Sequence, residues 1–121
     1  IYPAPPSRMP ILYALVADGS RVLAEHSTRE GNFKAVARQL LSEIPANDDR
    51  KSYEAQDVIF SYISEQSGLV FMCMTTVNSK ALLPWVFMED VKSRFWSDYP
   101  DGSFHQVHNY LISSSLNSSI T

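Results

Sequence analysis

The side chains that most often carry catalysis or bind metals are few in this sequence and widely spaced. His105 and His108 lie three residues apart and would share one face of a helix, but no further ligand follows at the spacing of a metal site. Cys73 lies in an apolar run with no basic neighbour that would lower the pKa of its thiol. We therefore interpret both histidines and His26 as surface residues, and Cys73 as a small buried hydrophobe. The sequence predicts no metal site.

The acidic residues and the glycines also lack a catalytic arrangement. Asp48-Asp49 and Glu89-Asp90 are adjacent pairs that we interpret as solvated. Neighbouring residues of a helix point in different directions, so Glu89 and Asp90 cannot form an acid/base pair on one face. No two glycines lie within ten residues of each other, which excludes a glycine-rich phosphate-binding loop. We expect a protein that is not an enzyme and holds no cofactor.

The composition favours one small domain. The 121 residues, 45% of them apolar, are enough for a single core. Ten basic and thirteen acidic residues give a net charge of −3, which argues against a nucleic-acid partner. The single cysteine cannot form an internal disulfide, and no apolar run reaches the roughly 18–20 residues that span a bilayer. We expect a soluble cytosolic domain.

The apolar spacing predicts the elements that would position a functional surface. The continuous apolar runs 11–17 and 69–74 predict central strands covered on both faces. Alternation and turn residues predict further strands at 21–27, 51–55 and 58–63. Hairpins on either side of one helix imply an α+β fold with a mostly antiparallel sheet and helices on both of its faces.

Helical spacing predicts two or three helices. The first runs over 33–44, with Asn32 as its N-cap and Pro45 as its stop. The second begins at Pro84 and carries a stripe of apolar residues four apart, namely Leu83, Phe87, Val91 and Phe95, with Val86 and Tyr99 near the same stripe. A third helix from Phe104 is allowed, although its serines weaken that prediction.

A binding surface is the alternative place for function. If 51–55 is an edge strand, it exposes unpaired backbone groups beside an amphipathic helix. An extended peptide could add to that edge, or a helix could dock in the adjoining groove. Phe60 is the more typical core residue of this region, whereas Tyr53 fits the core or the surface equally well.

The order and spacing of these segments resemble the N-terminal longin domain of the long R-SNAREs, of the tetanus-insensitive vesicle-associated membrane protein type, which are synaptobrevin-like. The matching segments cover about residues 9–102. They are 11–19, 22–25, 31–33, 44–45, Tyr53, 60–63, 71–75, 83–84, 87–91, 94–95 and Tyr99. The resemblance implies a longin, profilin-like fold, in which a five-stranded antiparallel sheet has one helix on one face and two on the other.

The resemblance also implies a regulatory and sorting role in membrane fusion and vesicle-mediated transport. Such a domain binds its own SNARE motif, coat adaptors or trafficking effectors through a hydrophobic groove. Cognate Q-SNAREs would pair with that motif, and membrane attachment would come from a C-terminal anchor, both outside this sequence. The implied location is the cytosolic face of endosomal, vacuolar, lysosomal or secretory vesicle membranes. Carried over by position, the partner-binding residues are Phe33, Val36, Leu40, Lys51, Tyr53, Val58 and Phe60.

The sequence departs from the family pattern in three places. Lys51 stands where the family usually has an apolar residue, which adds a charge to a groove expected to be apolar. Residues 1–8 form a proline-rich tail or a cloning remnant, and 103–121 match poorly, as a third helix or a linker toward the SNARE motif. The alternative function is a longin-like structural subunit of a tethering or adaptor complex.

Overall fold

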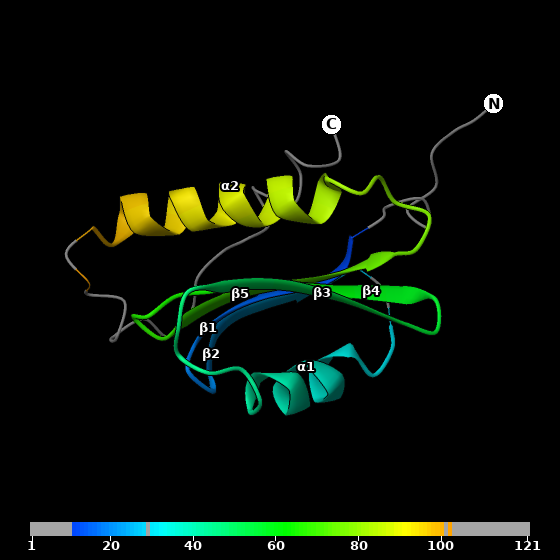
Figure 1. Cartoon of the computed structure of the whole chain (residues 1–121), viewed down its shortest axis with the longest axis horizontal. Helices are drawn as coiled ribbons and strands as arrows, with labels where there is room; N and C mark the ends of the chain where they lie inside the picture. The colour runs from blue at the N-terminus through cyan, green and yellow to red at the C-terminus, as the bar shows by residue number, and fades with distance from the viewer. Residues whose placement is uncertain (1–10, 29, 101, 103–121) are drawn as a thin grey trace.

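The computed structural model describes residues 11–28, 30–100 and 102, which form one antiparallel sheet with a helix on each face (Figure 1). The strand order is β2-β1-β5-β4-β3, and all neighbouring strands pair antiparallel. Along the chain the elements are β1 Ile11–Asp18, β2 Arg21–Ser27, α1 Phe33–Leu41, β3 Asp49–Ala55, β4 Val58–Ser64, β5 Leu69–Thr76 and α2 Leu83–Asp98. The α+β prediction and the order of these elements are confirmed.

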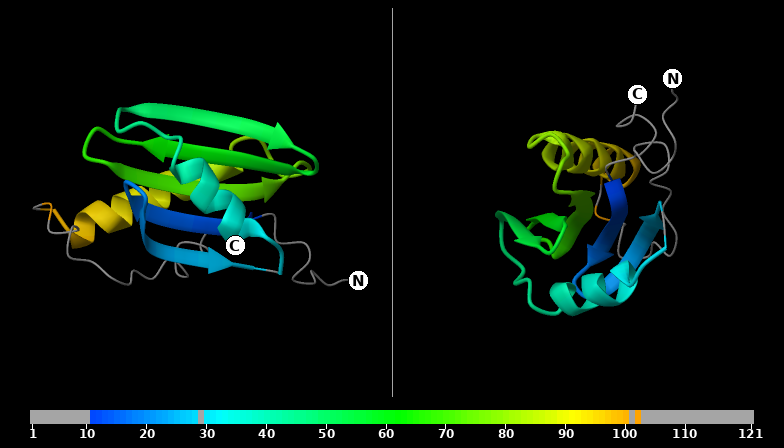
Figure 2. Two further views of the ribbon diagram at one scale, coloured as in Figure 1. Left: turned by 90° about the horizontal axis from the view of Figure 1, so that it is seen from below. Right: turned by 90° about the vertical axis from the view of Figure 1, so that its right-hand side faces the viewer.

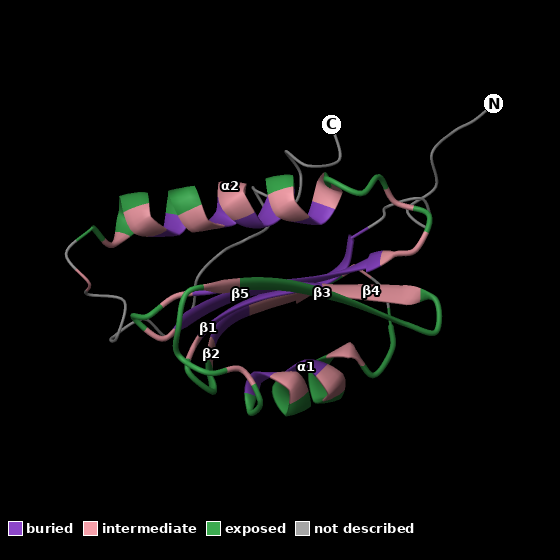
Figure 3. Ribbon diagram, in the orientation of Figure 1, coloured by how far each residue is buried: buried purple, intermediate pink, exposed green. Residues whose placement is uncertain are grey.

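The two continuous apolar runs form the middle of the sheet. β1 and β5 are adjacent, and seven of the eight residues in each are buried. Both strands are therefore covered on both faces, as their lack of polar alternation predicts. Figure 3 shows this buried centre, with exposed residues along β3 and the outer side of α1.

Each helix covers its own half of the core. Side chains of α2, such as Phe87, Val91 and Phe95, pack with Phe71 and Val16 on one face of the sheet. A second cluster on the opposite face lies under α1 and includes Leu15, Met72 and Ala37. The end-on view in Figure 2 shows the sheet between α2 and α1.

The first helix is shorter than predicted. It ends at Leu41, not at Ile44, and the backbone continues in tight turns in which the amides of Glu43 and Ile44 donate to the carbonyls of Leu40 and Leu41, at 3.0 and 3.3 Å. Pro45 disfavours the α conformation for Ile44, which excludes Ile44 from the helix. Ile44 nevertheless packs against the core.

Two details of the helices need correction. Asn32 occupies the N-cap position of α1, but its side chain makes no capping hydrogen bond. Val86 does not belong to the buried stripe of α2, because 61% of it is exposed, whereas Tyr99 packs against the α2-side core. Neither described helix is long and apolar enough to cross a membrane. The predicted tail at 1–8 and the predicted third helix at 103–121 lie outside the described residues.

Candidate functional site

β3 forms an open edge of the sheet beside α1. Among the described strands it pairs with β4 alone, and its residues from Arg50 to Ala55 are exposed. Polar side chains dominate this strand, which limits unwanted pairing of the edge. Tyr53 is the exception, because it is a large apolar side chain that remains 48% exposed. An exposed tyrosine on an open edge strand is typical of a binding surface.

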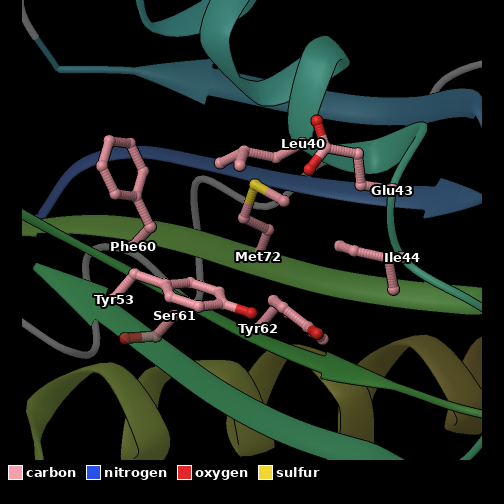
Figure 4. Close-up of a pocket in the computed structure, with 8 residues that line it drawn as sticks. All are labelled: Leu40, Glu43, Ile44, Tyr53, Phe60, Ser61, Tyr62 and Met72. Carbon is pink, nitrogen blue, oxygen red and sulfur yellow. The ribbon is translucent and has the colours of Figure 1, made fainter. Parts of the chain in front are cut away.

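A hollow of about 240 Å³ lies between the end of α1 and the outer strands of the sheet. Figure 4 shows Leu40, Glu43 and Ile44 on the helix side, Tyr53, Phe60 and Tyr62 on the strands, and Met72 between them. We call this feature the α1–β3 groove. Its lining is Leu40, Glu43, Ile44, Tyr53, Phe60, Ser61, Tyr62 and Met72.

Two tyrosines give the groove an uncharged wall. The rings of Tyr53 and Tyr62 lie 6.5 Å apart and tilted by 33°. Burial, together with the neighbouring Tyr53, raises the pKa of Tyr62 to about 12. The Tyr62 hydroxyl is therefore protonated at neutral pH. Tyr62 itself is buried, whereas the exposed Tyr53 is the tyrosine that an occupant would meet first. This wall suits an apolar side chain that ends beside a hydrogen-bonding group.

A polar cluster joins α1 to the opposite edge of the sheet, at β2. The Glu25 carboxylate on β2 accepts hydrogen bonds from the Tyr13 hydroxyl at 2.5 Å and from Arg38 Nη1 and Nη2 at 3.1 and 3.0 Å. The Arg38 hydrogen bonds hold the pKa of Glu25 below its usual value, and burial raises that of Tyr13. We call Tyr13, Glu25 and Arg38 the α1 latch, because they join the helix to β1 and β2.

The structure brings together three of the seven predicted partner-binding residues in the groove itself. Leu40, Tyr53 and Phe60 line it. Phe33, Val36 and Val58 lie on the same face but pack against the α1-side core cluster, and the Phe33 ring stacks on Tyr13 at 6.4 Å. The remaining residue, Lys51, stands exposed on β3 with its Nζ 3.8 Å from Asp49 Oδ2.

Sequence reasoning missed Tyr62 and Met72, which also line the groove. Met72 and Tyr62 occupy opposite positions of the β4–β5 ladder, and Tyr62 also lies opposite Lys51 of β3. The alternation of side chains along β4 puts Tyr62 on the same face as Phe60. The period of two was thus sufficient to find Tyr62, whereas Met72 required the pairing of β4 with β5, which the sequence does not specify.

Several of the residues weighed above as catalytic or metal-binding candidates are buried or form ion pairs. Cys73 is fully buried, and burial raises the pKa of its thiol. Glu89 and Asp90 are ion-paired with different arginines, Arg50 on β3 and Arg94 on α2, and their side chains remain 44% and 34% exposed, in agreement with a solvated pair. Within residues 11–28, 30–100 and 102, no three His, Cys, Asp or Glu side chains are grouped to hold a metal ion. His105 and His108 lie outside these residues.

A family model described as "Regulated-SNARE-like domain" of the longin family matches residues 23–120. Vesicle-associated membrane protein 7B of Dictyostelium discoideum is 43% identical over 93 residues, which are 77% of this chain and 35% of that protein. Vesicle-associated membrane protein 712 of Arabidopsis thaliana is 36% identical over 104 residues, covering 86% and 47% of the two chains. Vesicle-associated membrane protein 7 of Mus musculus is 35% identical over 91 residues, covering 75% and 41%.

A solved structure supports the same fold. The yeast R-SNARE Nyv1p, described as a longin domain protein, superimposes with a TM-score of 0.61 at 11% identity, over 90% of this chain and 85% of that one. The expected longin fold is confirmed. Neither the family description nor the relatives' names is that of an enzyme, in agreement with the sequence analysis. The chain spans between about a third and a half of the length of the relatives it matches.

Proposed function

The chain belongs to the longin family of regulated-SNARE-like domains, and on that basis we propose that it is the N-terminal regulatory and sorting domain of a vesicle R-SNARE. In this proposal residues 9–102 are the longin core and 103–121 are a third helix or a linker toward a SNARE motif. The domain acts at the cytosolic face of endosomal, vacuolar, lysosomal or secretory vesicle membranes. Its role is to bind protein segments that control fusion and sorting.

The α1–β3 groove carries this proposal. It is about 240 Å³, below the roughly 300–1,000 Å³ of small-molecule sites, so it suits one or two anchoring side chains of a polypeptide. The exposed Tyr53 and the half-buried Phe60 and Leu40 offer apolar surface for such anchors. Phe33, Val36 and Val58 support this wall from the core side.

The proposed mechanism is competition for the groove. A SNARE motif tethered to the domain has a high effective concentration and occupies the groove until another segment displaces it. While it is bound there, it cannot pair with cognate Q-SNAREs. Coat adaptors and trafficking effectors compete for the same residues, so sorting and restraint of fusion exclude each other on one surface.

Binding of the SNARE motif is the experiment that tests this function. The segment encoded after Thr121 would be made separately, labelled, and titrated with the 121-residue chain in a fluorescence anisotropy assay. We expect saturable binding that Tyr53→Ser weakens at least tenfold, because the substitution removes an aromatic anchor from the groove wall. Circular dichroism should find Tyr53→Ser folded, since Tyr53 is 48% exposed.

Leu82 and Val86 supply the matched control. They are exposed apolar residues at the start of α2, 70% and 61% exposed, on the opposite face of the sheet from the groove. Leu82→Ser and Val86→Ser should leave the affinity unchanged. Absence of binding at high micromolar concentrations, to both the SNARE motif and any adaptor, would overturn the competition mechanism and favour a structural subunit of a tethering or adaptor complex.

A further inference from the structure

Lys51 is the charged residue beside the open side of the α1–β3 groove. In the β3–β4 ladder Lys51 lies opposite Tyr62, and Tyr53 lies opposite Phe60. Since side chains two apart on a strand share a face, Lys51 stands on the groove side, next to Tyr53. Its side chain is 52% exposed. An occupant that reaches Tyr53 therefore also comes within range of the Lys51 ammonium.

The Lys51 ammonium is only weakly engaged by its own chain. Its Nζ lies 3.8 Å from Asp49 Oδ2, beyond hydrogen-bond distance, and Asp49 uses Oδ1 to accept from the Arg50 amide. Within the described part of the chain, no other carboxylate lies within ion-pair distance of Lys51. The ammonium retains donors for the carboxylate of a partner.

The opposite rim of the groove carries the opposite charge. Glu43 follows α1 and lines the groove, and Figure 4 shows it on the helix side, across from the tyrosines of β3 and β4. It has no ion-pair partner among residues 11–28 and 30–100. Lys51 is thus the charged neighbour of Tyr53 on the strand side and Glu43 is the acid on the helix side, while the acid Asp49 lies two residues before Lys51, farther from Tyr53 along β3.

The edge itself indicates the conformation of the occupant. The outer side of β3 pairs with no other described strand, so its backbone N–H and C=O groups can extend the sheet by one strand. A segment added there presents alternate side chains on the α1 face, about 6.6 Å apart. That spacing equals the spacing of Lys51 and Tyr53 on β3.

We propose that the groove selects an extended polypeptide segment that pairs with β3 and carries an acidic residue two positions from a large apolar residue. The apolar side chain enters the groove beside Tyr53, and the acidic side chain pairs with Lys51. Glu43 repels an acidic residue placed over the groove, so the acid belongs on the strand side. This inference rests on the proposed function, and it deepens that function by naming the chemistry of the partner.

A random twelve-residue peptide display library tests the proposal. It would be selected on the 121-residue chain, on Lys51→Glu and on Lys80→Glu, which makes the same charge change at an exposed residue of the loop before α2. We expect the unsubstituted chain and Lys80→Glu to enrich peptides with Asp or Glu two positions from Leu, Ile, Met or Phe. Lys51→Glu should enrich Lys or Arg at the acidic position.

The affinities of one selected peptide then measure how much the pairing between Lys51 and the peptide's acidic residue contributes to binding. Replacing its acidic residue by the neutral amide should weaken binding to the unsubstituted chain about two- to fivefold, the range of an exposed ion pair. The same replacement should not weaken binding to Lys51→Glu. Raising the salt concentration should reduce the difference between the two peptides.

The failures of the two proposals are distinguishable. If the enriched pattern is the same on the unsubstituted chain and on Lys51→Glu, or places the acid three or four positions from the apolar residue as in a helix, the inference is wrong while the groove remains a binding site. If Tyr53→Ser leaves binding of every selected peptide unchanged, the proposal that the α1–β3 groove is a binding site is wrong. A dimer that these peptides dissociate would assign the β3 edge to a second copy and overturn the inference.

Discussion

Single residues in this fold divide into those that stabilise the core and those left available at its edge. Tyr53 and Phe60 face each other across the β3–β4 ladder, yet only Phe60 is half-buried, while Tyr53 is 48% exposed. The difference arises from position, because β4 has neighbours on both sides and β3 on one. An aromatic side chain can therefore pack against the core on one strand and stay exposed on the next.

Replacing the hydroxyl of Thr75 with a methyl group should stabilise the protein. It is fully buried on β5, and its hydroxyl has no hydrogen-bond partner among the described residues. Thr75→Val replaces the unpaired hydroxyl with a methyl group of similar size, so we expect the free energy of unfolding to rise by about 1 kcal/mol. Urea denaturation measures this change.

The neighbouring threonine supplies the control for that measurement. Thr76→Val makes the same replacement at a half-exposed position, where the hydroxyl can reach water, and should change the unfolding free energy by less than about 0.5 kcal/mol. A lower unfolding free energy for Thr75→Val would show that the hydroxyl makes a stabilising hydrogen bond.

At the scale of elements, the α1 latch joins the first helix to the sheet. Glu25 is held by hydrogen bonds from Tyr13 and Arg38, and Lys34 adds an ion pair at 3.9 Å. The helix has only nine residues, and of these only Ala37 and Leu41 are buried. With so small a buried face, we infer that the latch contributes substantially to positioning α1 beside the groove.

The latch predicts a dependence of stability on acid pH. Because Arg38 lowers the pKa of Glu25 in the folded state, the stability that Glu25 contributes is present above its ordinary pKa of 4.5 and is lost as the pH falls through the lowered folded-state value. The unfolding free energy of the unsubstituted chain should therefore decrease below pH 4.5 more steeply than that of Glu25→Gln.

Thermal or urea unfolding between pH 2.5 and 7 would measure the difference between these two proteins. At pH 7 Glu25→Gln should be less stable by about 1 kcal/mol, because it loses the charge-assisted hydrogen bonds to Arg38. Parallel pH profiles of the two proteins would mean that Glu25 has the same pKa in the folded and unfolded states.

The turn between β3 and β4 predicts a second element-scale effect. Gln56 adopts a φ of +57°, a left-handed conformation that costs a non-glycine residue roughly 1 kcal/mol. Gln56→Gly should therefore raise the unfolding free energy by roughly 0.5 kcal/mol, after allowance for the greater flexibility of glycine in the unfolded chain. Asp57→Gly, at the other turn position, should lower it. A decrease for Gln56→Gly in urea denaturation would argue against the left-handed turn.

Sequence patterns were most informative for the two central strands. The runs at 11–17 and 69–74 lack polar residues, so their central position followed from burial on both faces. The end of α1 was less accessible, because Ile44 keeps the helical spacing of apolar residues while Pro45 prevents the helical backbone from reaching it. Val86 was misplaced because it lies only one residue from the buried Phe87, and that difference separates the outer face of α2 from the inner face.

The α1–β3 groove was harder to predict than the fold, since it joins residues from four elements. Leu40, Tyr53 and Phe60 were identified through the family resemblance, whereas Met72 and Tyr62 depend on which strands pair and in what register. Glu43 lies in turns that the sequence analysis assigned to a helix. Local patterns identify faces of single elements, but a groove is defined by the distances between elements.

At the scale of the whole molecule, the two faces of the sheet are covered to different extents. α2 covers one face with sixteen residues and is joined by ion pairs to β3, through Arg50 and Glu89, and to the loop after β4, through Lys92 and Glu65. The nine-residue α1 covers the other face incompletely and leaves the groove beside β3. We infer that the α2 face supplies stability and the α1 face supplies recognition.

The most direct test is a comparison of two-dimensional amide NMR spectra of the 121-residue chain and of a longer chain that continues through the segment encoded after Thr121. Our account predicts that the longer chain shifts the amide signals of Leu40, Tyr53, Phe60 and Tyr62, and leaves those of Leu82 and Val86 unchanged. Tyr53→Ser in the longer chain should return the groove signals toward their positions in the shorter one. Unchanged groove signals in the longer chain would contradict the claim that this groove holds the chain's own SNARE motif.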